Sequence, residues 1–198
     1  MNCDTALRRW NGRYLKEGAE WRSRPPRRML LDWAHMLPEC GMAFDAGAGV
    51  GTTGLFLAAR GLRVIAMDYS EVALKIAAER ARSDSLPLRA AVYDLKLLHL
   101  PDEYFDVIVN FFFLERVNLE IYRRALHPGG VLFFETLFRN DPMSVVPEHY
   151  LERGELLHNF AGFDILHWAE AVECGENKFS EQLVARKPSV GELGPRTV

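Results

Sequence analysis

Short apolar runs of strand length alternate with segments of helical periodicity along most of the chain. In Ser70–Arg82, for example, the apolar residues recur at helical spacing behind a serine that suits an N-cap. Five strands are predicted this way, at Met42–Ala46, Leu62–Met67, Pro87–Val92, Tyr104–Val109 and Val131–Thr136. Helices are predicted at Thr52–Arg60, Ser70–Arg82, Leu114–Leu126 and Glu152–Phe160. Repeated strand–helix units of this length predict a parallel sheet with helices on both faces.

The C-terminal part breaks this rhythm with two strand-like runs, Phe163–Ala171 and Phe179–Arg186. Only Val172–Lys178 separates them, and because this connection is too short for a crossover helix, the two runs are predicted to pair as a hairpin. The expected fold class is therefore α/β: a doubly wound, Rossmann-like, mostly parallel seven-stranded sheet with a C-terminal antiparallel hairpin. Residues 1–187 are expected to form one domain, and the Pro- and Gly-rich residues 188–198 a disordered tail.

Composition places the chain among ordinary globular proteins, with 198 residues, 48% hydrophobic and 26% charged. Its three cysteines form no C-x-x-C pair and its six histidines lack metal-ligand spacing, so neither a disulfide framework nor a metal site is predicted. Residues 42–59 approach the length of a membrane span with one charge, but a short strand, a glycine turn and a helix explain them better. A cytoplasmic protein without a membrane partner is expected, because the charged N-terminus has no apolar leader.

Basic residues concentrate near the N-terminus. Residues 8–28 hold eight lysines or arginines and two glutamates, whereas the whole chain has a net charge of −3. Such a segment could attract an anionic substrate or RNA. The alternative interpretation is a solvated amphipathic helix with Trp10, Tyr14 and Trp21 facing the protein body. The acidic remainder of the chain argues against a nucleic-acid partner.

The sequence F-D-A-G-A-G-V-G-T, residues 44–52, carries the most chemical information. A glycine-rich turn between the first strand and the first helix lets a ligand approach the backbone at the point where open α/β sheets bind ligands. The pattern is G-x-G-x-G, and Thr52 takes the place of the last glycine in the dinucleotide fingerprint. Asp68 ends the second strand 21 residues after Gly47, the usual spacing for a carboxylate that accepts hydrogen bonds from ribose hydroxyls.

Asp45 distinguishes between nucleoside ligands. A carboxylate beside the glycine turn repels a pyrophosphate, whereas it stabilises the ammonium and sulfonium groups of S-adenosylmethionine, which has no phosphate. Asp94 follows the third strand and could accept a hydrogen bond from an adenine amino group. Each aspartate alone is equally compatible with a helix cap or a solvated loop. Their shared position at the ends of strands one, two and three favours S-adenosylmethionine as the cofactor.

With these motifs the chain resembles class I S-adenosylmethionine-dependent methyltransferases, most closely the group around the tellurite-resistance methyltransferase. The resemblance runs from about Trp10 to Lys187 and includes W-N-G-R-Y, V-I-A-M-D-Y-S, F-D-V-I-V-N, L-H-P-G-G-V-L and E-Q-L-V-A-R-K-P. It implies that the glycine turn and Asp45 hold the methionine part, while Asp68 binds the ribose. The implied cofactor-binding residues are Asp45, Gly47, Ala48, Gly49, Gly51, Asp68, Tyr69, Ser70, Asp94, Leu95 and Asn110.

The acceptor side is less defined. The aromatic run that begins at Phe111 could wall an acceptor pocket or simply belong to the core. Arg13 and Arg116 could recognise an anionic acceptor or remain solvated. The candidate acceptor residues are Arg13, Tyr14, Phe111 and Arg116. No residue is a convincing general base, so no catalytic residue is assigned.

The predicted function is methyl transfer from S-adenosylmethionine to a small-molecule acceptor by in-line displacement. Two alternatives stay open: a NAD-dependent oxidoreductase, which shares the glycine turn and Asp68, and a non-catalytic nucleoside-binding protein. An RNA methyltransferase is a further variant, prompted by the basic N-terminal segment. The sequence leaves the acceptor and the oligomeric state undetermined.

Overall fold

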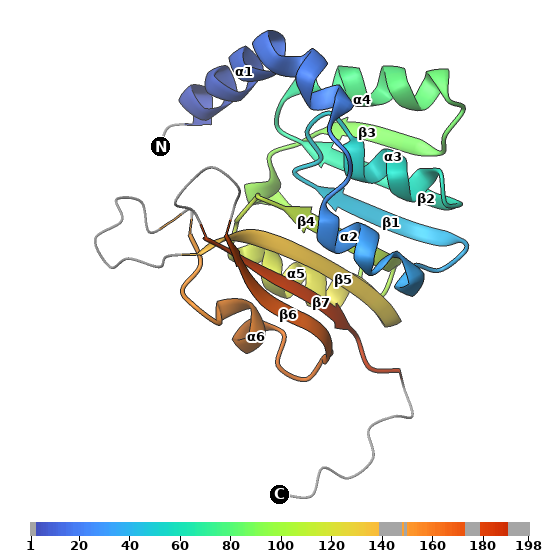
Figure 1. Cartoon of the computed structure of the whole chain (residues 1–198), viewed down its shortest axis with the longest axis vertical. Helices are drawn as coiled ribbons and strands as arrows, with labels where there is room; N and C mark the ends of the chain where they lie inside the picture. Colours follow the sequence, from blue (N-terminus) through green and yellow to red (C-terminus); the bar gives the residue numbers. More distant parts are fainter. Residues whose placement is uncertain (1–2, 139–147, 149, 173–178, 190–198) are drawn as a thin grey trace, which may run out of the picture. The chain divides into compact units, whose positions relative to one another are not determined.

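Three parallel strands form the sheet of the first of two units, Met1–Leu98 (Figure 1). The structure, a computed structural model, describes residues 3–138, 148, 150–172 and 179–189. β1 (Gly41–Ala46) pairs with β2 (Leu62–Asp68), which pairs with β3 (Leu88–Val92), so the strand order is β3-β2-β1. The helices of this unit are α1 (Cys3–Ser23), α2 (Arg28–Asp32), α3 (Thr52–Ala58) and α4 (Glu71–Ser83), with 3-10 turns η1 (Ala34–Met36) and η2 (Leu95–Leu97).

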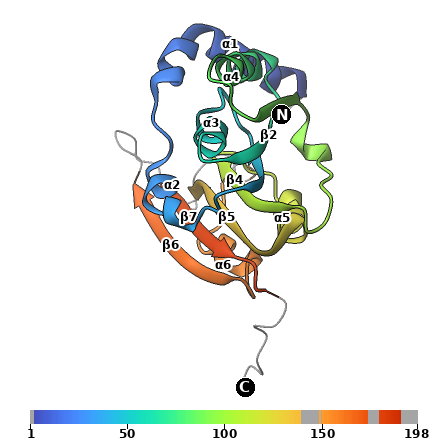
Figure 2. The ribbon, with the colours of Figure 1, turned by 90° about the vertical axis from the view of Figure 1, so that its right-hand side faces the viewer.

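The basic N-terminal segment forms the long helix α1, which lies along α4 (Figures 1 and 2). Tyr14 is buried and packs with Val50 and Ala73. Trp21 is partly buried against this cluster, and the ring of Trp10 stacks on Tyr14 at 5.8 Å between centroids. The amphipathic-helix interpretation is therefore confirmed, because the aromatic side of α1 packs on its own unit.

Four strands form the second unit, His99–Val198, in the order β4-β5-β7-β6. They are β4 (Phe105–Phe111), β5 (Leu126–Phe138), β6 (Asp164–Val172) and β7 (Phe179–Arg186), and the helices are α5 (Val117–Ala125) and α6 (Glu155–Asn159). β4 and β5 are parallel, whereas β7 is antiparallel to both β5 and β6. The predicted hairpin is confirmed, and so is the fold class: α/β, mostly parallel, with seven strands and antiparallel C-terminal strands.

The segment around Pro128 differs from the prediction. The helix predicted at Leu114–Leu126 begins only at Val117, and β5 begins at Leu126 instead of Val131. Proline disfavours the helical conformation in the residue before it, so the chain is already extended at His127. A Cβ on Gly130 would lie 2.9 Å from the carbonyl oxygen of His127, so glycine lets the strand continue there. The Pro-Gly-Gly sequence thus belongs to the strand.

Side chains on β5 alternate between two faces of the second sheet. Phe134 packs against Tyr122 of α5, with ring centroids 6.3 Å apart, and Tyr122 also contacts Asn110 of β4. The next residue, Glu135, lies on the opposite face.

Two predicted segments, the hairpin connection and the C-terminal tail, extend beyond the residues that the structure describes. Residues 173–178 of the hairpin connection and residues 190–198 of the predicted tail lie outside the described residues. The domain boundary after residue 187 stays a prediction. No described helix is both long and apolar enough to span a bilayer.

Replacing Gly51 with alanine tests the packing of the turn that precedes α3. Gly51 has φ +76°, and a Cβ there would lie 2.6 Å from the Cβ of Ala77. The expected loss in the free energy of unfolding is about 2–4 kcal/mol, from left-handed strain plus the steric clash. The control is Gly154→Ala, which also has φ +76° but nothing within 4 Å, so about 1 kcal/mol is expected. Equal losses in urea unfolding would contradict the steric contribution.

Candidate functional site

Two strand-to-helix turns of the first unit meet at Asp68. Its Oδ2 accepts a hydrogen bond from the backbone amide of Gly49 at 2.8 Å, and its Oδ1 accepts one from the amide of Ser70 at 2.8 Å. Burial raises the pKa of Asp68, although these two amides and that of Tyr69 oppose the shift. Both carboxylate oxygens are thereby fixed in orientation between the glycine turn and the start of α4.

The glycine turn itself depends on left-handed backbone conformations. Gly47, Gly49 and Gly51 have φ values of 67°, 53° and 76°. The amide of Ala48 donates to the carbonyl of Met67 at 3.0 Å, which attaches the turn to β2. The turn therefore brings the backbone amide of Gly49 to Asp68.

Asp45 is a buried carboxylate at the end of β1, with 2% of its surface exposed. Its Oδ2 accepts no hydrogen bond from any residue that the structure describes. Burial raises the pKa of Asp45 to about 7; the Gly54 amide opposes this shift and the charge of Asp68 adds to it. A buried acceptor without a donor costs about 1–3 kcal/mol. This oxygen lies against α3, 2.9 Å from where a Cβ of Gly54 would be.

The other predicted cofactor residues of this unit follow β2 and β3. The amide of Tyr93 donates to the carbonyl of Asp68 at 3.0 Å, which brings the segment with Asp94 and Leu95 beside Asp68. Asp94 caps η2 by accepting a hydrogen bond from the Lys96 amide at 3.0 Å, and Leu95 is buried. Asp94 thus has the capping role that the sequence left as its alternative, and this role is compatible with ligand binding by its second oxygen.

Helix α1 contributes to this site more than the sequence indicated. The Ser70 hydroxyl accepts from the Ala73 amide as the N-cap of α4 and donates to Oδ1 of Asn11 on α1. The hydroxyl of Tyr14 lies against the glycine turn, 2.9 Å from where a Cβ of Gly49 would be. Burial and the charge of Asp68 raise the pKa of Tyr14. The structure therefore places Tyr14 at the predicted cofactor turn, and adds Asn11, for which the sequence had no signal.

In the second unit, Asn110 and Phe111 end β4. The Asn110 side chain is buried: its Nδ2 donates to the Tyr122 hydroxyl at 3.3 Å, while its Oδ1 accepts no hydrogen bond from the described residues. Phe111 is half-buried, and Phe112 follows it with φ +60°, a strained conformation for a residue with a large side chain. This end of β4 therefore has a buried polar acceptor and a strained turn, features that cluster at functional sites.

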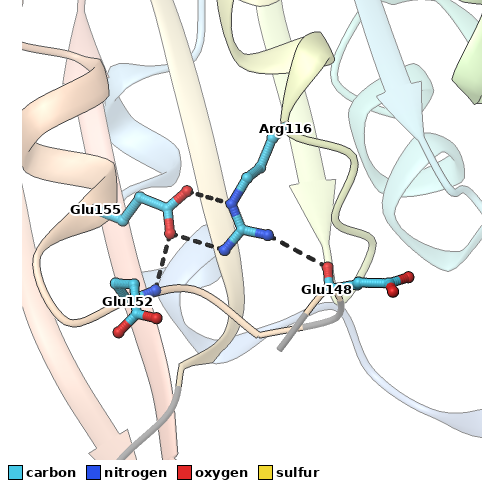
Figure 3. Close-up of a pocket in the computed structure, with 4 residues that line it drawn as sticks. All are labelled: Arg116, Glu148, Glu152 and Glu155. Atoms are coloured by element: carbon cyan, nitrogen blue, oxygen red, sulfur yellow. Dashed lines mark hydrogen bonds and ion pairs between the residues drawn. The ribbon is translucent and has the colours of Figure 1, made fainter. Parts of the chain in front are cut away.

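Arg116 lies in a hollow with three glutamates (Figure 3). Its Nε and Nη2 donate to the two carboxylate oxygens of Glu155 at 2.6 and 2.9 Å, and Nη2 also donates to the carbonyl of Tyr150 at 2.7 Å. Arg13, the other candidate for an anionic acceptor, is exposed and pairs with Glu17 at 3.1 Å. Both guanidinium groups have carboxylate partners, so an anionic acceptor would have to displace them.

Metal-ligating side chains do not gather in the part of the chain that the structure describes, where no group of three or more His, Cys, Asp or Glu residues could hold an ion.

Comparison with known proteins supports the predicted resemblance. The methyltransferase-domain family model matches residues 44–134, from within β1 to β5. The predicted resemblance to S-adenosylmethionine-dependent methyltransferases is therefore confirmed.

The chain spans only part of the length of the relatives it matches. The chain is 33% identical over 137 residues to hemagglutinin 1 from Eikenella corrodens. The aligned region covers 65% of this chain and 45% of that protein. The chain is 29% identical over 143 residues to ubiquinone biosynthesis O-methyltransferase from Coxiella burnetii, covering 64% and 60%. The crystal structure of TehB from Haemophilus influenzae has a TM-score of 0.72 at 18% identity, covering 86% and 65%. That likeness is one of fold, so the narrower grouping stays a prediction.

Asp45→Asn tests the buried charge through pH dependence. The folded-state pKa of about 7 lies above the unfolded value of about 3.9, so the native state keeps the proton that the unfolded chain releases. Stability from this group is present at low pH and is lost as pH rises from about 4 to about 7. Between pH 5 and 7 the asparagine variant is expected to gain about 1–3 kcal/mol relative to the wild type in urea unfolding. A pH-independent difference would contradict the raised pKa.

Arg116→Lys tests the bidentate ion pair between Arg116 and Glu155 in the second unit. Lysine keeps the charge but cannot make two parallel hydrogen bonds to Glu155, so a loss of about 1 kcal/mol and faster amide exchange at residues 150–155 are expected. The control is Arg28→Lys, whose partner Asp32 is exposed and whose own side chain is 86% exposed, so no more than about 0.5 kcal/mol is expected. Equal effects of the two changes would show that the Arg116 geometry is unimportant.

Proposed function

We propose that this chain is an S-adenosylmethionine-dependent methyltransferase that transfers a methyl group to a small-molecule acceptor by in-line displacement. The observation that carries the proposal is the buried carboxylate of Asp45, whose Oδ2 accepts no hydrogen bond from the described residues and which lies at the entrance to the glycine turn. In its charged form this carboxylate would attract the ammonium and sulfonium groups of the donor, whereas it would repel a pyrophosphate.

The residues of the first unit fit the remainder of the donor. Asp68 is held by the amides of Gly49 and Ser70, and each of its oxygens has further acceptor capacity for a ribose hydroxyl. The left-handed glycines leave the turn without side chains, which permits close approach to the backbone. Asp94 and Leu95 would contact the adenine, one as a polar acceptor and the other as a buried apolar surface.

When bound, S-adenosylmethionine supplies a methyl group on a positively charged sulfur that is already activated for displacement. The protein's part is to orient the reactants and to exclude water. In the second unit, Asn110 presents a buried carbonyl oxygen with a partial negative charge, which suits the sulfonium side of the donor. Phe111 would form an apolar wall for the acceptor.

The named relatives support a small-molecule acceptor. One of them is described as an O-methyltransferase of ubiquinone biosynthesis, and the chain spans 60% of its length. For this chain we propose the reaction class alone. Its partner would be a small molecule, and neither a membrane nor a nucleic acid. The reaction would take place in the cytoplasm.

Two other functions make different use of the same residues. A NAD-dependent oxidoreductase would have to place a pyrophosphate beside Asp45, which is unfavourable for the charged form of that residue. A non-catalytic nucleoside-binding protein would bind the donor but form no S-adenosylhomocysteine with any acceptor. Product formation with a panel of small acceptors therefore separates an enzyme from a binding protein.

Isothermal calorimetry with S-adenosylmethionine tests the donor site. Asp68→Ala removes a charged hydrogen-bond acceptor and is expected to weaken binding by about 1–3 kcal/mol, or roughly 5- to 150-fold. The control is Asp84→Ala, an exposed aspartate after α4, which should leave the affinity unchanged. NADH is expected not to bind. Unchanged affinity in Asp68→Ala, or clear NADH binding, would count against the proposal.

A further inference from the structure

Glu135 is a carboxylate inside the apolar strand β5, in the sequence V-L-F-F-E-T-L-F, with 1% of its surface exposed. Its Oε1 accepts hydrogen bonds from Oγ of Ser180 at 3.0 Å and from Nε2 of Gln182 at 2.8 Å, both on β7. The Oε1 of Gln182 in turn lies 3.4 Å from Nε2 of His167 on β6. Side chains from the C-terminal hairpin therefore fix the orientation of this buried carboxylate.

The position of Glu135 in the sheet brings it to the predicted acceptor wall. In the parallel register of β4 and β5, Glu135 is paired with Phe111, so their side chains lie on the same face of neighbouring strands about 4.8 Å apart. The amide of Phe112 donates to the carbonyl of Glu135 at 2.7 Å, which connects the strained turn after β4 to the same residue. The carboxylate that is paired in register with Phe111 therefore belongs to Glu135, which is buried and held in a fixed orientation.

A second buried glutamate lies on β7, and its Oε2 accepts no hydrogen bond from the described residues. Glu181 on β7 is also fully buried, but it lies on the opposite face, where it accepts a hydrogen bond from Nε1 of Trp168 at 2.8 Å. Burial raises its pKa, and the amides of Leu156 and Gly154 at the start of α6 oppose the shift. Glu181 therefore anchors α6 and β6, whereas Glu135 lies on the face of Phe111.

Charge favours an acceptor without a negative charge. A carboxylate beside the acceptor repels an oxyanion, and the two arginines that could have compensated are each paired with a carboxylate, Arg13 with Glu17 and Arg116 with Glu155. An O–H or N–H group, in contrast, can donate a hydrogen bond to Glu135. Glu135 and the two paired arginines thus favour an uncharged or positively charged acceptor over an anionic one.

We propose that Glu135 binds the methyl acceptor and removes its proton, and that the acceptor is a small molecule with a hydroxyl or amine group and no negative charge. This inference rests on the proposed methyltransferase function. The acceptor's lone pair forms a bond to the methyl carbon, and the carbon–sulfur bond breaks with its electron pair moving to sulfur. The proton on the acceptor oxygen or nitrogen passes to the Glu135 carboxylate and leaves to water after product release.

The test uses the full chain with S-adenosylmethionine and measures S-adenosylhomocysteine formation. The probes are catechol and tyramine, which carry no negative charge, with tellurite and dithiothreitol as oxyanion and thiol probes. Turnover is expected with catechol or tyramine. Glu135→Gln, which keeps an acceptor oxygen for Ser180 and Gln182, should lower kcat with that probe at least 100-fold while the affinity for S-adenosylmethionine stays within twofold. The matched control Glu181→Gln should change kcat less than threefold.

A change of specificity separates this role from a purely structural one. At a pH where catechol is neutral and 4-nitrocatechol has lost a proton, the wild type should prefer catechol. In Glu135→Gln the ratio of kcat/KM for the two probes should shift at least tenfold towards 4-nitrocatechol, because the repelling carboxylate is gone and that probe needs no base.

Three results would overturn the inference. They are unchanged kcat and probe ratio in Glu135→Gln, equal losses in Glu181→Gln, and S-adenosylmethionine binding without turnover of catechol or tyramine. Failure of the wild type to bind S-adenosylmethionine at all would instead refute the proposed function.

Discussion

The hydrogen bonds that Asp68 accepts from Gly49 and Ser70 are the interaction on which the first unit's candidate site depends. One carboxylate joins the glycine turn to the start of α4, with Gly49 and Asp68 19 residues apart in the chain, so the two turns cannot move independently. Ser70 then connects this arrangement to α1 through Asn11. Because charged acceptors make stronger hydrogen bonds than neutral ones, a single aspartate can organise the whole end of this sheet.

Asp45 has the opposite character, since its Oδ2 has no donor among the described residues. Burying an acceptor in this way lowers stability, and such cost is typical of sites whose missing partner is a ligand. Asn110 in the second unit has the same feature, a buried Oδ1 without a donor in the described structure. Asp68 is therefore organised by the protein itself, whereas Asp45 and Asn110 each keep acceptor capacity that the described residues leave unused.

Local signals in the sequence predicted the strands, the glycine turn and the hairpin, because periodicity, left-handed glycines and the length of a connection act over a few residues. The same reasoning failed where residues distant in sequence meet. The Asn11–Ser70 hydrogen bond joins residues that are 59 positions apart. The Arg116–Glu155 ion pair joins residues that are 39 positions apart, so an arginine that was a candidate for anion binding already has a carboxylate partner. Glu135 did have a local signal, an acidic residue within an apolar strand, but its meaning depends on Ser180 and Gln182, which only the antiparallel pairing of β5 and β7 brings beside it.

The glycine turn and Asp68 lie in the first unit and Glu135 lies in the second, and the construction of the two units explains why the former were easier to infer. The predicted donor residues of the first unit lie in consecutive turns of a parallel sheet, where spacing alone locates them. The candidate acceptor residue Glu135 is held by β7, whose side chains can change without altering the glycine turn or Asp68. A fold that fixes the donor in one segment and varies the acceptor surface in another can serve many substrates. For that reason the acceptor class has to be inferred from contacts such as Ser180–Glu135–Gln182, and motifs do not reveal it.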